Sequence, residues 1–309
     1  MVAAAVDRRI CTATGCLRNL SRRANPALTL FRTSDTSRPF PLGRFPERRG
    51  PPASGTVTRM RAPDDPAYPR AAAPAAATVA DLDARVPRCA ACPRLVGWRE
   101  EKARDDLPAY RGQEYWARPV PGFGPPDAPL LIVGLAPAAH GANRTGRMFT
   151  GDRSGDVLCA ALYDLGLASR PDPVAADDGL TLRGVRMSSP VRCAPPQNRP
   201  TPGERDTCRP WLARELELLA PALRSVVVLG AFGWQALLPV LAAAGWAVPR
   251  PRPAFGHGVR ITLDGPAGSR PLDLFGCYHV SQRNVFTGRL TPAMLREVLD
   301  GAARTAGIR

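Results

Sequence analysis

The sequence predicts an α/β protein in which helices cover both faces of a central, mostly parallel sheet, a three-layer α/β/α arrangement. Two observations carry this prediction. Short apolar runs typical of buried strands alternate with segments whose apolar residues have helical spacing. In addition, a long glycine-punctuated stretch, residues 134–152, follows the first apolar run, where open α/β sheets place their ligand sites.

Five strands are expected. They lie at Leu130–Val133, near 181–191, at Ser225–Leu229, near 258–263 and at 272–278. The first and third are continuous runs of apolar β-formers, a composition typical of strands that are buried on both faces.

Helices are expected at 78–86, 95–104, 154–166, 204–223, 232–244 and 291–306. Thr78 is a suitable N-cap for the first helix, and Thr291 followed by Pro292 is a typical start for the last one. Together with the strands, these helices form one domain over residues 78–309.

Residues 1–77 are expected to form a disordered extension. Residues 1–70 hold 13 arginines, no lysine and 5 acidic residues, with no sustained periodicity, and a proline- and alanine-rich stretch follows them. No apolar core of a secretory signal follows Arg8 and Arg9. An alternative source of this segment is a start codon placed upstream of the true one.

The net charge of +15 favours a polyanionic partner such as nucleic acid. The alternative is an arginine-, alanine- and proline-rich composition of the kind that a GC-rich genome produces. No apolar run is long enough to predict a membrane span. We therefore expect a cytoplasmic protein.

Four cysteines have a spacing that suggests metal ligation. Cys89 and Cys92 form a CxxC pair, and Cys193 and Cys208 follow about 100 residues later. Disulfides are disfavoured without a secretory signal. Four thiolates suit either tetrahedral zinc or an iron–sulfur cluster, and the wide spacing of the second pair leans towards a cluster. Four unrelated buried cysteines are the remaining alternative.

Three loops follow three of the strands and should meet at one edge of a parallel sheet, at 134–152, 193–203 and 279–288. They supply backbone amides at Gly134, an aromatic ring at Phe149, a carboxylate at Asp152, an amide at Asn198 and an imidazole at His279. Such a set suits a planar heterocycle that is stacked, hydrogen-bonded at its edge and then detached. Each residue also has a structural alternative, for instance Asp152 as the N-cap of the helix that follows.

Four long motifs resemble family 5 uracil-DNA glycosylases. They are GLAPAAHGANRTGRMFTGD from Gly134, VRCAPPQNRPTP from Val191, HVSQRNVFTGRLT from His279 and CxxCPRLVxWRE from Cys89. The resemblance covers nearly all of residues 78–309 and has no counterpart in residues 1–77. It implies the same α/β/α fold and a [4Fe–4S] cluster on Cys89, Cys92, Cys193 and Cys208.

The resemblance also implies an activity. Such enzymes flip a damaged base out of DNA and hydrolyse its N-glycosidic bond, which starts base excision repair. Asp152 with Asn198 would position the water, and His279 would donate to the departing base. The base would stack on Phe149 beside Gly134. The family's pattern further implies activity on hypoxanthine, xanthine or ethenocytosine as well as uracil.

DNA itself is expected to contact the polar residues of the first and third loops, which are Asn143, Arg144, Gln282, Arg283 and Asn284. The substrate would be double- or single-stranded DNA containing uracil or other deaminated bases. The enzyme is expected to be a bacterial, nucleoid-associated monomer.

Lys102 is the only lysine of the chain and lies outside all three loops. Backbone cleavage by glycosylases proceeds through an amine–sugar Schiff base. We therefore expect a monofunctional hydrolase. Two alternatives stay open, a uracil-restricted enzyme like family 4 and a non-enzymatic iron–sulfur DNA-binding protein on the same scaffold.

Overall fold

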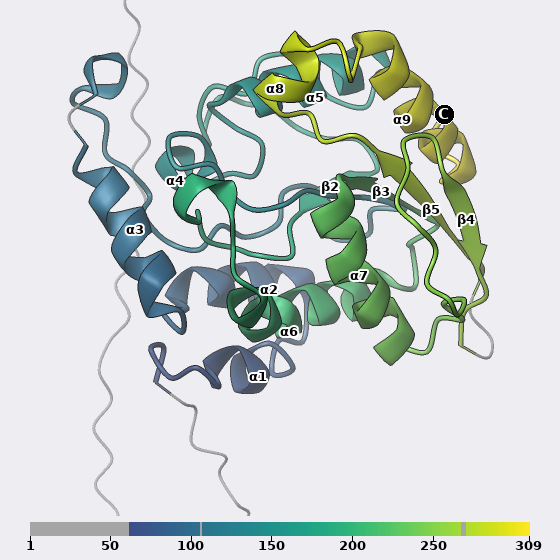
Figure 1. The fold of residues 1–309 in the computed structure, drawn as a ribbon, viewed down its shortest axis with the longest axis horizontal. Coiled ribbons are helices and arrows are strands. Elements are labelled where there is room, and N and C mark those ends of the chain that lie inside the picture. The colour runs from purple at the N-terminus through teal and green to yellow at the C-terminus, as the bar shows by residue number, and fades with distance from the viewer. Residues whose placement is uncertain (1–61, 106, 267–269) are drawn as a thin grey trace, which may run out of the picture. The chain divides into compact units, whose positions relative to one another are not determined.

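A five-stranded sheet forms the centre of the computed structural model, which describes residues 62–105, 107–266 and 270–309 (Figure 1). The strand order is β2-β1-β3-β5-β4. The strands are β1 (Leu130–Val133), β2 (Val185–Ser188), β3 (Ser225–Leu229), β4 (Arg260–Leu263) and β5 (Leu272–Cys277). All neighbouring pairs are parallel except β4 with β5. The predicted mostly parallel sheet is confirmed.

Nine α-helices lie in the described part of the chain. They are α1 (Tyr68–Ala72), α2 (Val79–Arg85), α3 (Pro93–Ala103), α4 (Ala142–Thr145), α5 (Arg153–Asp164), α6 (Pro202–Leu219), α7 (Ala231–Ala243), α8 (Gln282–Phe286) and α9 (Pro292–Thr305). Thr78 and Thr291 cap α2 and α9 as expected. None of these described helices is long and apolar enough to cross a membrane.

Two apolar cores separate the three layers. Because side chains alternate along a strand, Leu130 and Ile132 of β1 pack on one face and Leu131 and Val133 on the other. The first face is covered by α5 and α9, and the second by α6 and α7. The α/β/α arrangement predicted from the sequence is confirmed.

The folded part begins before Thr78, so the prediction of disorder is wrong for residues 62–77. Helix α1 lies in this range, and Tyr68 is 3% exposed. Its ring packs against that of Trp211 in α6, with 6.1 Å between the centroids. Because alanine side chains are small, the backbone of this alanine-rich segment can lie close to α6. Residues 1–61, predicted to be disordered, lie outside the described residues.

A buried ionic network attaches α6 to strand β2. Glu215 of α6 is fully buried and accepts from Arg186 Nε at 2.6 Å, and it also pairs with Arg192. Asp83 of α2 accepts from Arg186 Nη2 at 2.6 Å. Burial raises the pKa of Glu215, but the charges of Arg192 and Arg186 outweigh it and lower the pKa to about 2. Glu215 therefore stays ionised, and the network fixes two helices to one edge of the sheet.

Candidate active site

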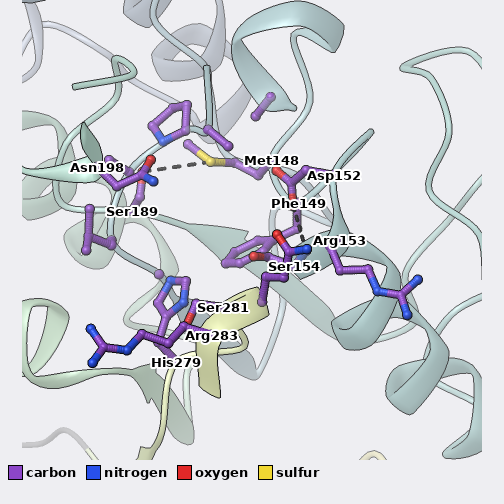
Figure 2. A pocket seen from close by; sticks show the side chains of 17 residues that line it. Met148, Phe149, Asp152, Arg153, Ser154, Ser189, Asn198, His279, Ser281 and Arg283 are labelled. Carbon is purple, nitrogen blue, oxygen red and sulfur yellow. Dashed lines mark hydrogen bonds between the residues drawn. The ribbon is translucent and has the colours of Figure 1, made fainter. Parts of the chain in front are cut away.

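A cavity of about 510 Å³ opens at the carboxyl ends of β1, β2 and β5. Three segments distant in sequence form it, as predicted for the three loops (Figure 2). Its lining includes Gly134, Ala136, Ala138, Met148, Phe149, Asp152, Arg153, Ser189, Asn198, His279, Gln282 and Arg283. A concave site of this size, in which polar groups converge beside apolar ones, is typical of small-molecule recognition.

The two carboxylate oxygens of Asp152 have different surroundings. Its Oδ1 accepts from the backbone N–H groups of Ser154 at 2.8 Å and Gly155 at 3.0 Å, which makes it the N-cap of α5. Its Oδ2 lies beside Gly141, where a Cβ atom would come within 2.7 Å of Cγ and closer still to Oδ2. The cap thus holds the carboxylate at the cavity wall.

Phe149 lies against the backbone of Gly134 at the end of β1. A Cβ atom at position 134 would come within 2.6 Å of Cζ of the Phe149 ring. Glycine is therefore required for the ring to lie at the floor of the cavity. The Phe149 backbone has a φ of 51°, a left-handed conformation that is uncommon for a bulky residue.

Asn198 lies at the opposite side of the cavity from Asp152 (Figure 2). It ends the short 3₁₀ helix Pro196–Asn198 with a φ of 56°, and Gln197 before it has a φ of 54°. Two successive left-handed residues turn the chain sharply and bring the amide to the cavity. The loop is held by Arg94, whose Nη2 donates to the Arg199 carbonyl at 3.2 Å.

His279 follows β5 and its ring lines the cavity from the side of the third loop. Asn284 Nδ2 donates to the His279 carbonyl at 2.8 Å. Asn284 therefore positions the histidine and does not line this cavity, and its contact with DNA stays a prediction. Burial lowers the pKa of His279 to about 4. The ring is consequently neutral at physiological pH and carries one N–H donor.

The other predicted DNA contacts separate into two groups. Gln282 and Arg283 are exposed on α8 at the mouth of the cavity. Asn143 is fully buried, and its Nδ2 donates to the Arg99 carbonyl at 3.2 Å, so the prediction that it contacts DNA is wrong. Arg144 donates within the protein to the carbonyls of His140 and Gly151. It braces the first loop.

The four predicted ligand cysteines line one small cavity. Arg99 is 5% exposed and its Nη1 donates to Cys193 Sγ at 3.1 Å. The backbone N–H of Arg192 donates to Cys208 Sγ at 3.3 Å. Within the described ranges, however, no three or more His, Cys, Asp or Glu side chains form a group that could hold a metal ion. The cysteines share a cavity without surrounding a single ion.

Comparison with known proteins shows which family the chain resembles. A family model described as the uracil DNA glycosylase superfamily matches residues 121–303. A type-5 uracil-DNA glycosylase of Mycobacterium bovis is 54% identical over 233 residues, 75% of this chain and 84% of that protein. Proteins of the same description from Mycobacterium leprae and Thermus thermophilus are 52% and 49% identical, covering 75% and 71% of this chain and 98% and 94% of theirs.

The chain belongs to the type-5 uracil-DNA glycosylases. The family and the enzyme class predicted from the motifs are thereby confirmed, and the chain is a DNA glycosylase. These relatives have the type-5 description, and the alternative of a type-4 enzyme is set aside.

Lys102 of this glycosylase is held away from the cavity. Its Nζ pairs with Glu101 at 3.1 Å and Asp105 at 3.0 Å and lies 4.5 Å from the centroid of the Trp98 ring. Hydrogen bonds to these carboxylates raise the pKa of Lys102. The amine therefore stays protonated, which is the wrong state for a nucleophile.

Three features of the glycosylase, two at the cavity and one on the adjoining helix α8, were not predicted from the sequence. Ser189 follows β2 and lines the cavity, and its Oγ donates to the Val191 carbonyl at 2.8 Å. Gly141 makes room for Asp152, and Phe286 on α8 is 71% exposed. A polar residue directly after a strand could have indicated Ser189. No sequence signal distinguishes Phe286 from a core phenylalanine.

The glycosylase should lose activity only towards acid pH. Burial is the main cause that raises the pKa of Asp152 above 3.8, and the pKa of His279 is about 4. An ionised Asp152 and a neutral His279 coexist only above both values. Single-turnover rates on a uracil-containing oligonucleotide should therefore rise from acid pH and level off once Asp152 is ionised. A loss of activity as the pH rises through about 6.5, the ordinary histidine value, would contradict the neutral His279.

Proposed function

We propose that this protein removes uracil from DNA by hydrolysing its N-glycosidic bond. One observation supports this most directly. The Asp152 carboxylate, the Phe149 ring and the His279 ring come from two distant segments and line the same cavity. A cavity of this kind can stack a flipped-out base, polarise its edge and present a water to its sugar.

The proposed roles follow from the geometry of each group. Phe149 stacks on the base beside Gly134. His279 donates its neutral N–H to a base carbonyl, which stabilises the negative charge that develops as the base departs. Asp152, with Asn198, positions the attacking water, and its negative charge offsets the positive charge on the sugar.

Other deaminated or damaged bases should also enter this cavity. Ala136, Pro137, Ala138 and Ala142 line the side that follows β1, and none of them projects a large polar group. A cavity bordered by small apolar side chains discriminates weakly by size. The proposed substrates therefore include hypoxanthine, xanthine and ethenocytosine.

The decisive assay measures free base release. Purified full-length protein is incubated with single- and double-stranded oligonucleotides containing uracil, hypoxanthine, xanthine or ethenocytosine, and the released bases are quantified. Release of uracil supports the proposed function, and release of the larger bases supports the broad pocket. Binding to these oligonucleotides without release of any base would identify a non-enzymatic DNA-binding protein.

The proposed reaction stops at an abasic site. Lys102, the sole lysine, is bound to carboxylates outside the cavity. Base release should therefore leave the DNA strand uncut until alkali or heat is applied. Strand scission without such treatment would overturn the monofunctional assignment.

We further propose that Cys89, Cys92, Cys193 and Cys208 hold a [4Fe–4S] cluster. In such a cluster each thiolate binds a different iron, so four sulfurs around one cavity fit it better than a single zinc ion. Donation to sulfur from Arg99 and from the Arg192 backbone also fits a thiolate-rich centre. Burial raises the pKa of Cys92 to about 12 and of Cys193 to about 11, so these thiols need a bound cation to ionise.

The colour of the purified protein tests this cofactor. Protein isolated without oxygen should be brown, with a broad visible absorbance from sulfide-to-iron charge transfer that dithionite or acid bleaches. A Cys193→Ser variant should lose most of this absorbance, whereas Cys277→Ser, a buried cysteine outside this cavity, should keep it. A colourless wild-type protein that contains zinc would contradict the cluster.

Phe286 is expected to support base flipping in duplex DNA. It is 71% exposed on α8, the short helix whose residues Gln282 and Arg283 line the cavity. An aromatic ring there can fill the gap that the flipped base leaves. Phe286→Ala should lower kcat/KM on duplex DNA by about tenfold, since one aromatic stacking contact supplies about 1–3 kcal/mol. Activity on single-stranded DNA should change little.

Tyr163→Ala is the matched control for Phe286, because Tyr163 is 48% exposed and lies outside the cavity. Equal losses on single and double strands would exclude the proposed role of Phe286.

Both single- and double-stranded DNA are proposed substrates. The monomeric state and nucleoid association stay predictions.

A further inference from the structure

The segment that carries Phe149 and Asp152 has an unusual backbone. Phe149 has a φ of 51° and Gly151 a φ of 79°. A left-handed conformation at a bulky residue persists only where the surrounding structure imposes it. Some neighbouring element must therefore hold this segment in place.

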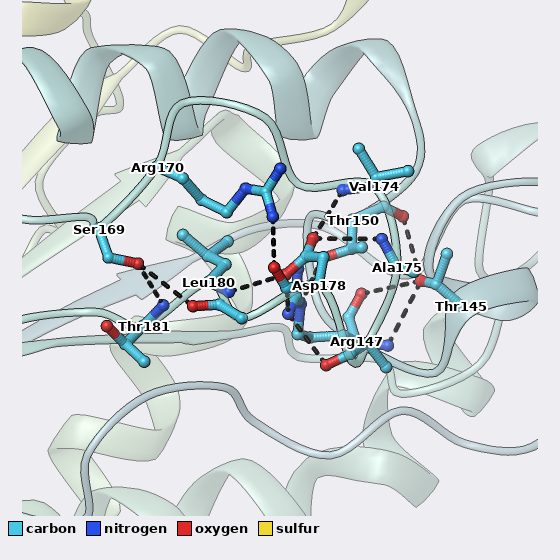
Figure 3. Close-up of polar contacts among 12 residues, drawn as sticks. Thr145, Arg147, Thr150, Ser169, Arg170, Val174, Ala175, Asp178, Leu180 and Thr181 are labelled. Carbon is cyan, nitrogen blue, oxygen red and sulfur yellow. Dashed lines mark hydrogen bonds and ion pairs between the residues drawn. The ribbon is translucent and has the colours of Figure 1, made fainter. Parts of the chain in front are cut away.

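A second loop, residues 173–180, lies against the segment and is organised by Asp178 (Figure 3). The Asp178 carboxylate accepts from the backbone N–H groups of Val174 at 2.8 Å, Ala175 at 3.2 Å and Leu180 at 2.8 Å. Arg170 donates to the carbonyl of Asp178. One side chain thus closes the whole loop around itself.

Arg147 connects this loop to the catalytic segment. Its Nη1 and Nη2 donate to the two carboxylate oxygens of Asp178 at 2.9 and 2.6 Å, and both side chains are 7% exposed. Its Nε donates to Thr150 Oγ1 at 2.9 Å, directly after Phe149. The planar guanidinium is thereby fixed at three nitrogen positions, a geometry that lysine could not reproduce.

Two more hydrogen bonds hold the segment, one to the Asp178 loop and one within the first loop itself. The backbone N–H of Gly151 donates to the Pro173 carbonyl at 2.8 Å, and Thr145 Oγ1 donates to the Thr150 carbonyl at 3.2 Å. Arg147 before Phe149 is consequently held by Asp178, and Thr150 and Gly151 after it are held by Arg147 and by the Asp178 loop. Neither Arg147 nor Asp178 lines the cavity.

We propose that the Arg147–Asp178 pair positions the Phe149 ring and the Asp152 carboxylate relative to each other for base excision. The inference rests on the proposed function. Arg147 and Asp178 act through Phe149 and Asp152, and they touch neither base nor sugar. Because a misplacement of about 1 Å at reacting groups can cost about 10²-fold in rate, a loosened segment should affect chemistry before DNA binding.

The test is the variant Asp178→Asn, which keeps the shape of the side chain and removes its charge. The single-turnover rate of uracil release should fall by about 10²-fold. Affinity for a duplex carrying a non-hydrolysable deoxyuridine analogue should be unchanged. Hydrogen–deuterium exchange in residues 145–152 should accelerate, while exchange in β3 stays as in the wild type.

Asp83→Asn is the matched control. It also removes a carboxylate partner from a buried arginine, Arg186, but lies away from the cavity. It should lower the melting temperature without changing the rate of uracil release, measured well below that temperature. Equal rate losses in the two variants would show a general effect of stability and overturn the proposal.

A second variant covers the case that Asp178→Asn does not fold. Thr150→Val removes the acceptor of Arg147 Nε, together with the donor to the Met148 carbonyl, and keeps the ion pair. It should lower the rate in the same direction. Normal uracil release by the wild type with unchanged rates in the folded variants would overturn this inference alone. No release by the wild type would overturn the proposed function and this inference with it.

Discussion

Asp152→Asn should remove most of the base excision activity and leave the fold intact. Asparagine is as good an N-cap as aspartate, so the hydrogen bonds from Ser154 and Gly155 can be kept. The variant loses the negative charge that orients water and stabilises the sugar cation. A positioned acid–base group contributes about 10²–10⁴-fold, and the single-turnover rate should fall by that factor.

Asp152→Ala separates the two tasks of this side chain. It should lose the same activity and, in addition, about 1 kcal/mol of unfolding free energy through the lost cap. Denaturant unfolding and DNA binding, measured on both variants, separate the loss of the cap from the loss of the carboxylate charge. If Asp152→Asn kept wild-type rates, the water would have to be positioned by another residue, with Asn198 as the remaining candidate in the cavity.

Gly141→Ala should impair excision nearly as much as the loss of Asp152 itself. The added Cβ atom would lie 2.7 Å from Asp152 Cγ, a separation that packed atoms do not adopt. The carboxylate cannot simply retreat, because Oδ1 is held by two backbone N–H groups of α5. One methyl group should therefore displace the catalytic oxygen, with a rate loss of about 10²-fold.

Gly97→Ala provides the comparison, since a Cβ atom at that exposed position of α3 meets nothing within 4 Å. It should keep the wild-type rate and gain slightly in stability because alanine favours helices. The excision rates of both variants on uracil-containing duplex, together with their melting temperatures, test these expectations. Wild-type activity in Gly141→Ala would mean that the first loop can shift without moving Asp152.

The sequence predicted the fold well where local signals and tertiary environment agree. Strands β1 and β3 lie at their predicted residues because continuous apolar β-formers suit only a buried central strand. Strand β2 is shorter than the predicted range 181–191, since the four residues of β1 offer it no further partners. Helices α4 and α8 were not predicted, because helices of four or five residues exist only through packing.

The site could be predicted as a set of residues but not as a set of contacts. Phe149, Asp152, Asn198 and His279 do meet, because parallel strands bring their following loops to one edge. The burial of Asn143 depends on a carbonyl 44 positions earlier in the chain. No local sequence pattern indicates such a distant partner. A polar residue in a loop is therefore predicted to be exposed. The same limitation hid the link between Arg147 and Asp178.

The carboxylates around Lys102 have a consequence for the damaged strand. With its ammonium group occupied, the protein offers no lysine to form an imine with the ring-opened deoxyribose. On the proposed reaction, the baseless sugar keeps both phosphodiester bonds and a reactive aldehyde. A separate endonuclease or lyase must then incise the backbone before a polymerase and a ligase can restore the missing nucleotide.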